Sequence, residues 1–169
     1  ALKLKGDYKN SLNNYERALE ISKKLNDNKL VSDFLTNIGL IHYDHSNYEK
    51  AFYYHKKALS KRKNIKDYYG IANSYNNIGQ VYYMKQDLIN ALLYYNKALA
   101  IFKNVENQDF IDNRYQNGLA NTYNKIGVIY ARNKDFKKSL IYWNKTLEIR
   151  KKINDKVGEL HTLNNIGKS

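Results

Sequence analysis

The sequence predicts an all-α fold built from repeated pairs of antiparallel helices. Three observations support this prediction: one short motif recurs four times, apolar residues recur at helical spacing, and short polar breaks separate the apolar runs. The four copies of the motif end at Gly39, Gly79, Gly127 and Gly167, which are 40, 48 and 40 residues apart. With 169 residues, of which 43% are hydrophobic, the chain is long enough for one domain or one short repeat array.

Two further sets of small residues keep the same irregular spacing as the glycines. They are Ser11, Ala51, Ala91 and Ser139, and Ala18, Ala58, Ala98 and Thr146. The long interval contains eight extra residues, which must lie between Ala98 and Gly127. The sequence therefore predicts one repeat array over residues 1–169, with an insertion near 104–114 that adds about two helical turns or a longer loop.

Each repeat is expected to contain a first and a second helix. In the first helix of one repeat, Tyr75, Ile78 and Tyr82 share one helical face. The second helix of that repeat, over residues 88–102, carries apolar residues at the same spacing. The motif glycines lie within first helices, where glycine costs about 1 kcal/mol relative to alanine. We expect close approach of the paired helix to offset this cost, with Ala51, Ala91 and Ser139 as the opposing small residues.

Polar residues mark where the helices begin. Their side chains can accept hydrogen bonds from the unpaired backbone N–H groups of the first turn. Second helices are expected to follow Gly6-Asp7, Ser46-Asn47, Asp87 and Lys134-Asp135. First helices are expected to follow Asp27, Asp67 and Asp155.

This pattern resembles the tetratricopeptide repeat (TPR), whose motif is aromatic-x2-Leu-Gly-x2-Tyr, then Ala-x3-Phe, then Ala. The copy most similar to it contains Tyr75, Ile78, Gly79, Tyr82, Ala91, Tyr95 and Ala98. The period of 40 and the absence of a closing proline differ from the common 34-residue form. In these respects the chain is similar to kinesin light chain and to bacterial peptide-sensing regulators. The resemblance implies a right-handed superhelical solenoid.

The two ends of the chain fall at the same repeat position, inside a first helix. Neither end has a polar capping helix, although repeat arrays need capping for solubility. We therefore expect the 169 residues to be a piece of a longer protein.

In TPR arrays the first helices line a concave groove, and residues there contact bound peptide. Counting from the motif glycines gives the face of the first helices that is not used for packing, and we expect it to be the groove. Its candidate residues are Asn37, Tyr43, Asn73, Asn76, Asn77, Gln80, Tyr83, Asn121, Asn124, Lys125, Arg132, Asn164, Asn165 and Lys168. The resemblance implies peptide contact for the positions just before Ile-Gly, which are Asn37, Asn77, Lys125 and Asn165. Most of the candidate residues are uncharged amides, which both donate to and accept from the backbone of an extended peptide. The alternative is that asparagine is simply abundant throughout this chain. Lys125, Arg132 and Lys168 favour a partner that is acidic or ends in a carboxylate.

The chain is strongly basic, with 29 Lys and Arg against 16 Asp and Glu and a net charge of +13. Basic residues gather late in the second helices, and Arg62 and Arg150 are among them. We interpret them as a solvent-exposed outer face that complements the helix dipole. Binding of nucleic acid is the weaker alternative, because the sequence has no motif that reads bases.

Neither a catalytic nor a metal site is predicted. The chain has no cysteine, which excludes disulfides, thiol nucleophiles and zinc fingers. His42 and His55 replace packing aromatics in the repeat, so we interpret them as core residues. No cofactor is expected, and no apolar run approaches the ~20 residues of a membrane span.

The sequence therefore predicts a non-enzymatic scaffold that binds a protein or an extended peptide. One alternative is the sensory region of a bacterial signalling protein with an attached kinase or DNA-binding domain. A second alternative is a basic helical repeat that associates with nucleic acid. A cytoplasmic location is expected, although the absence of cysteine also suits the periplasm.

Overall fold

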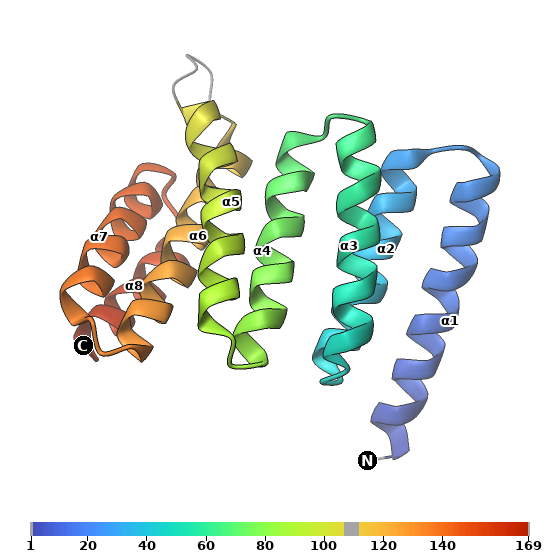
Figure 1. The fold of residues 1–169 in the computed structure, drawn as a ribbon, viewed down its shortest axis with the longest axis horizontal. Helices are drawn as coiled ribbons and strands as arrows, with labels where there is room; N and C mark the ends of the chain where they lie inside the picture. The colour runs from blue at the N-terminus through green and yellow to red at the C-terminus, as the bar shows by residue number, and fades with distance from the viewer. Residues whose placement is uncertain (1, 107–111, 169) are drawn as a thin grey trace. The chain divides into compact units, whose positions relative to one another are not determined.

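The structure is a computed structural model that describes residues 2–106 and 112–168. These residues form eight α-helices and the short turns between them, with no strand in the described ranges (Figure 1). The helices are α1 (Leu2–Lys24), α2 (Asn28–Asp44), α3 (Tyr48–Asn64), α4 (Tyr68–Met84), α5 (Leu88–Glu106), α6 (Asn113–Arg132), α7 (Phe136–Lys152) and α8 (Lys156–Gly167). The predicted all-α class is confirmed.

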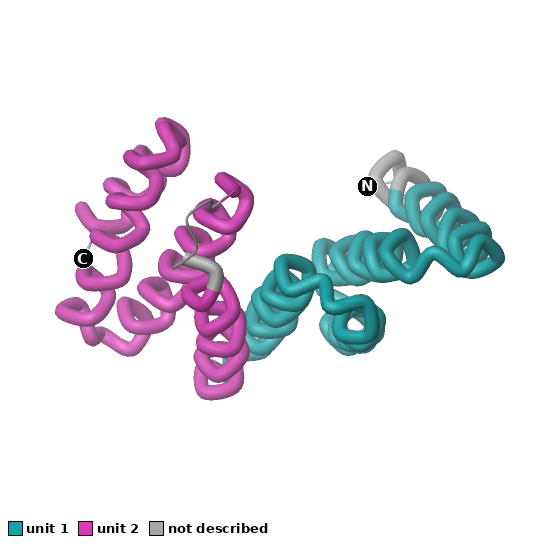
Figure 2. Tube along the Cα trace, turned by 90° about the horizontal axis from the view of Figure 1, so that it is seen from above, with its two compact units in different colours: residues 1–87 teal, residues 88–169 magenta. Residues whose placement is uncertain are grey.

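The chain divides into two compact units, residues 1–87 and residues 88–169 (Figure 2). In unit 1, α2 packs against α1 and α3, and α3 packs against α4. In unit 2, α6 packs against α5 and α7, and α7 packs against α8. Each unit thus contains helices packed against their sequence neighbours, as in a repeat protein. That one array runs through residues 1–169 stays a prediction.

The turns between helices share one backbone conformation that the sequence did not reveal. Residues with φ between 54° and 66° are Asn26, Ser46, Lys66, Gln86, Lys134 and Asn154, most of them 20 residues apart. In the turn after α2, His45 ends the helix and Ser46 takes the positive φ. The N–H of Asn47 then donates to the carbonyl of His42 over 2.8 Å. Glycine usually marks such a left-handed position, and none of these residues is glycine.

Side-chain caps begin the helices largely where the sequence placed them. Asp27, Asp67 and Asp155 accept from the first turns of α2, α4 and α8. Asn47 and Asp135 do the same for α3 and α7. The break predicted at Gly6-Asp7 is wrong, because α1 runs without interruption from Leu2 to Lys24. A single glycine weakens a helix by only about 1 kcal/mol and does not by itself end it.

The insertion is divided between two helices and their connection. Helix α5 has 19 residues where α3 has 17, and α6 has 20 where α4 has 17. Residues 107–112 replace a three-residue turn, and Asp112 caps α6. Because α5 and α6 pack against each other, helix packing continues past the insertion. Residues 107–111 of the predicted insertion lie outside the described residues.

Most of the small residues that recur with the glycines are packing positions, whereas Ser11 is exposed and Ala18 is half-buried. Ala51, Ala58, Ala91, Ala98, Ser139 and Thr146 have no exposed surface. In unit 1, buried Leu19, Val31, Leu35 and Ile38 form a core cluster with Ala58. Only small side chains allow two helices to approach closely at these points, so their recurrence at the repeat spacing reflects packing.

Rings of the paired helix are the groups nearest to two of the motif glycines. A Cβ at Gly39 would lie 2.6 Å from Cε1 of His55, and a Cβ at Gly127 would lie 2.7 Å from Nε1 of Trp143. Each of these glycines therefore makes room for a ring from the paired helix, which keeps the core dense. That Ala51, Ala91 and Ser139 lie opposite the motif glycines stays a prediction.

His42 and His55 are core residues, as predicted, with exposed fractions of 2% and 1%. The ring of His42 stacks on Tyr54 with centroids 5.4 Å apart, and its Nδ1 lies 3.2 Å from the Tyr8 hydroxyl. Burial lowers the pKa of both histidines, that of His55 to about 4. Both side chains are therefore neutral at physiological pH.

The fold should lose stability in mild acid because of His55. The folded-state pKa of about 4 lies below the unfolded value of 6.5, so the unfolded chain binds the proton first. The stabilisation is complete above the unfolded pKa and falls as the pH drops from 6.5 towards 4. We expect a loss of ~2 kcal/mol between pH 7.5 and pH 5, measured by urea unfolding. His55→Tyr, which copies Tyr95 of the next repeat, should remove most of this pH dependence.

Candidate functional site

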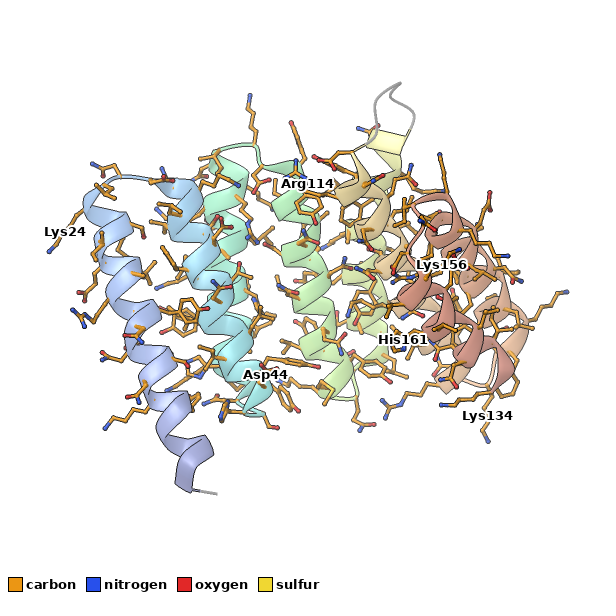
Figure 3. The ribbon with its side chains drawn as sticks, turned by 180° about the vertical axis from the view of Figure 1, so that it is seen from behind. Lys24, Asp44, Arg114, Lys134, Lys156 and His161 are labelled. Atoms are coloured by element: carbon orange, nitrogen blue, oxygen red, sulfur yellow. The ribbon has the colours of Figure 1, made fainter. Side chains whose placement is uncertain are left out.

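The predicted site residues lie on four helices, α2, α4, α6 and α8, except for Lys168, which directly follows α8. Figure 3 draws the side chains, with Asp44 of α2 and His161 of α8 among the labelled residues. We define the unit 1 stripe as Asn37, Tyr43, Asn73, Asn76, Asn77, Gln80 and Tyr83. The unit 2 stripe is Asn121, Asn124, Lys125, Arg132, Asn164, Asn165 and Lys168.

In the unit 1 stripe, a hydrogen bond joins two neighbouring first helices. Nε2 of Gln80 donates to the hydroxyl of Tyr43 over 3.0 Å, which links α4 to α2. Burial raises the pKa of Tyr43, so the hydroxyl keeps its proton at neutral pH. Asn37, Asn73 and Asn77 are half-buried. Asn76 is only 5% exposed, so little of its side chain is open to a ligand.

The unit 2 stripe contains a similar link. Nδ2 of Asn165 donates to Oδ1 of Asn124 over 3.1 Å, which joins α8 to α6. Asn121 instead accepts from Arg150 over 2.7 Å, so its oxygen is directed towards the end of α7. A primary amide offers two N–H groups and two lone pairs, so one such bond leaves it capacity for others.

Lys125 is a partly buried cation of the unit 2 stripe. Its amine lies 5.7 Å from the ring centroid of Tyr95. Burial lowers the pKa of Lys125 to about 8, so most of the amine is still protonated at pH 7. A partly dehydrated ammonium gains more from a carboxylate than a fully hydrated one does. Arg132 and Lys168 are exposed.

Arg62 is a structural residue that the sequence interpretation placed wrongly on the solvent-exposed outer face. It is 6% exposed, and its Nη1 donates to the Gly70 carbonyl over 3.2 Å and to Oγ of Ser74 over 2.8 Å. Its Nη2 lies 2.8 Å from Oδ1 of Asp33. One guanidinium at the end of α3 therefore joins α2 and α4. Lysine could not do this in the same way, because it lacks the planar fork of the guanidinium.

Arg150 repeats this arrangement in unit 2, where it pairs with Asp155 and Asn121. Its placement on the outer face is corrected in the same way, because only 12% of its side chain is exposed. A second glycine set accompanies these side chains: Gly70, Gly118 and Gly158 lie against Arg62, Phe102 and Arg150. These glycines are 48 and 40 residues apart. Because this is the spacing of the repeats, the sequence alone could have indicated these three glycine positions.

The described residues were predicted to contain neither a metal site nor a membrane span. Among the side chains of residues 8–104 and 112–168, no group of three His, Cys, Asp or Glu could hold a metal ion. The lowered pKa of Asp155 comes first from the backbone N–H of Gly158, so it reflects helix capping. Over the same two ranges, no helix has the length and apolar character needed to cross a membrane.

The chain is similar in structure to several helical repeat proteins. It matches BtubC (BKLC) from P. vanneervenii at 26% identity and a TM-score of 0.73, over 88% of this chain and 59% of that one. A Rap protein complexed with Competence and Sporulation Factor matches at 21% identity and a TM-score of 0.79, over 90% of this chain and 40% of that one. The apo form of RapI matches at 17% identity and a TM-score of 0.79, over 96% of this chain and 43% of that one. The chain thus spans about two fifths to three fifths of these relatives.

No curated protein matches the chain in sequence. One family model described as tetratricopeptide repeat matches residues 1–64 and 30–104, and a second with the same description matches residues 119–156. The gap between the two sets of matches coincides with the insertion. The chain belongs to the tetratricopeptide-repeat family.

Proposed function

We propose that this chain is a non-enzymatic binding scaffold whose first helices hold an extended protein or peptide segment. The observation that carries the proposal is that six amides of these helices are half-buried: Asn37, Asn73, Asn77, Gln80, Asn124 and Asn165. Three of them, Gln80, Asn124 and Asn165, are held by hydrogen bonds between neighbouring first helices. Side chains held in place lose less conformational entropy when a ligand binds. The Rap protein complexed with Competence and Sporulation Factor supports this use of a similar fold.

The unit 2 stripe favours a ligand with a carboxylate. Lys125, Arg132 and Lys168 are basic, and the stripe as defined contains no acidic residue. Charge-assisted hydrogen bonds to a carboxylate contribute about 1.5–3 kcal/mol each. The unit 1 stripe is made of amides and tyrosines, which suit the backbone of a peptide and not a particular charge.

A peptide library displayed on phage, followed by titration of selected peptides, tests the proposal. Lys125→Ala should weaken an acidic peptide about tenfold and leave a neutral one nearly unchanged. Because burial lowers the pKa of Lys125 to about 8, wild-type affinity for the acidic peptide should also fall between pH 7 and pH 9. Lys125→Arg, which does not titrate there, should bind equally at both pH values.

Asn77→Ala tests the amide contacts separately from charge. It should weaken acidic and neutral peptides alike, because backbone contacts do not depend on peptide sequence. Asn144→Ala, an exposed asparagine on α7, is the matched control and should change neither affinity. If Asn77→Ala and Lys125→Ala both bind like the wild type while substitutions on the second helices abolish binding, the first helices are not the binding surface.

Nucleic-acid binding is less well supported than the sequence alone suggested. Arg62 and Arg150 hold neighbouring helices together, so neither guanidinium is available to phosphates. Two of the exposed lysines that remain lie over tyrosine rings, Lys57 over Tyr53 and Lys145 over Tyr123.

A further inference from the structure

Unit 2 contains a small pocket between α6 and α7 that shares no residue with either stripe. Its volume is about 240 Å³. Its lining residues are Gln116 and Tyr123 from α6 with Lys145, Glu148, Ile149 and Lys152 from α7. Tyr123 and Ile149 are buried, whereas the three charged side chains are exposed. The pocket therefore joins a buried wall to a charged edge.

Gln116 gives this pocket a buried polar group. It is 5% exposed, whereas Asn28, Tyr68 and Lys156, which occupy the same position in the other repeats, are exposed. In the part of the chain that the structure describes, the side-chain amide of Gln116 takes part in no hydrogen bond. A primary amide has two N–H donors and an acceptor oxygen, and buried polar groups nearly always find a partner. The amide is thus available to a ligand in the pocket.

The charged edge of the pocket consists of two amines with one carboxylate between them. Lys145, Glu148 and Lys152 follow one another at spacings of three and four, so they share one face of α7. The two lysines are about 10 Å apart along the helix axis. Nζ of Lys145 lies 5.6 Å from the ring centroid of Tyr123. Among residues 8–104 and 112–168, none of the ion pairs involves these three side chains.

The equivalent positions of unit 1, 88 residues earlier, carry a different set of groups. The first lysine is kept as Lys57, but Ser60 stands in place of the glutamate and Asn64 in place of the second lysine. Asn28, at the position of the buried amide, is exposed and accepts from Lys61 over 3.3 Å. Of these two sets of positions, only that of unit 2 combines an amide without a partner, two amines and a carboxylate.

We propose that this pocket binds a free dicarboxylic amino acid, glutamate or aspartate. At neutral pH such a ligand carries two carboxylates and one ammonium, and the pocket supplies two ammoniums and one carboxylate, so every charge meets an opposite one. Lys145 and Lys152 pair with the two carboxylates, and Glu148 pairs with the ammonium. The buried amide of Gln116 bonds to a carboxylate oxygen.

The size of the pocket agrees with this ligand. Its volume is below the ~300–1,000 Å³ of sites for drug-sized molecules, which suits a ligand of about ten non-hydrogen atoms. A dicarboxylate without an ammonium fits less well, because it would leave Glu148 facing a carboxylate with no cation between them. Inorganic phosphate has the same disadvantage.

Titration of the isotope-labelled 169-residue chain with L-glutamate, followed by heteronuclear NMR, measures both the affinity and the place of binding. The side-chain NH₂ signal of Gln116, identified by its absence from Gln116→Leu, should shift until it saturates. Glutarate lacks the ammonium of glutamate, and γ-aminobutyrate lacks one of its carboxylates. Each should bind at least about tenfold more weakly, because each leaves a charged side chain of the pocket without its partner.

Exposed positions supply the variants, so folding should be normal, which circular dichroism checks. Glu148→Gln should weaken glutamate about tenfold and leave glutarate unchanged or bound more tightly, because only glutamate has an ammonium to lose. Lys152→Met should weaken glutamate and glutarate alike. Lys151→Met is the matched control: it removes the same charge one residue away, outside the lining, and should change either affinity less than about twofold. Lys57→Met, the equivalent of Lys145 in unit 1, should also have no effect.

Three results would overturn the proposal. A Gln116 signal that does not shift at millimolar glutamate would mean that the pocket does not bind this class of ligand. Equal affinities for glutamate and glutarate, both unchanged by Glu148→Gln, would mean that the pocket recognises negative charge alone. If inorganic phosphate displaces glutamate and binds more tightly than it does, the pocket is a phosphate site instead. Peptide binding by the first-helix stripes is measured with other variants, so failure of either proposal leaves the other standing.

Discussion

Replacing Gly127 by leucine should destabilise unit 2 by about 3 kcal/mol, the upper end of the ~1–3 kcal/mol usual for overpacking. A Cβ at this position would lie 2.7 Å from Nε1 and 2.8 Å from Cδ1 of Trp143. Trp143 is 4% exposed, so its ring has little room to withdraw. A leucine therefore forces either the indole or the helix pair to move. Urea unfolding followed by circular dichroism measures the loss.

Gly167→Leu is the matched control, because Gly167 occupies the same repeat position and no heavy atom lies within 4 Å of its added Cβ. In this chain it should change stability by less than about 0.5 kcal/mol. The pair isolates the effect of the opposing ring from the effect of losing a helical glycine. Equal and mild losses in both variants would contradict the packing of Trp143 against Gly127.

Replacing Arg62 by alanine should destabilise unit 1 by about 3 kcal/mol. Removing one partner of a buried ion pair typically costs ~3–5 kcal/mol, and the Asp33 side chain is 42% exposed, which lowers the expected loss. The substitution leaves the Gly70 carbonyl and the Ser74 hydroxyl without their guanidinium donor. It also removes the side chain that joins α2 to α4. Thermal unfolding of the variant, with urea unfolding for the free energy, tests this expectation.

Two further variants serve as controls for Arg62→Ala. Lys63→Ala removes an exposed cation one residue away, whose amine lies 5.8 Å from the Tyr75 ring centroid, and should cost less than about 1 kcal/mol. Arg62→Lys keeps the charge but loses the planar fork, so it should fall between the wild type and the alanine variant. If Arg62→Ala is as mild as Lys63→Ala, the outer-face interpretation of Arg62 was correct after all.

The predicted stripe residues show how far sequence reasoning reaches for a binding site. Periodicity placed them on the first helices, because residues three and four apart share a helix face. It could not indicate that Asn76 is buried, or that Gln80 bonds to Tyr43 and Asn165 to Asn124. These contacts join residues that are 37 and 41 apart in sequence, and they depend on how neighbouring helices dock. Their role in binding a peptide stays a prediction.

The sequence by itself determined the helices, their approximate ends, the repeat spacing and the place of the insertion. These features depend on local chemistry: apolar periodicity, and short side chains that cap the first turn. Only the tertiary structure decided that Gly39 and Gly127 lie against rings, and that Arg62 and Arg150 are joined to neighbouring helices. Each of these depends on which side chains from different helices compete for the same space, and residue types at repeat positions do not specify that outcome.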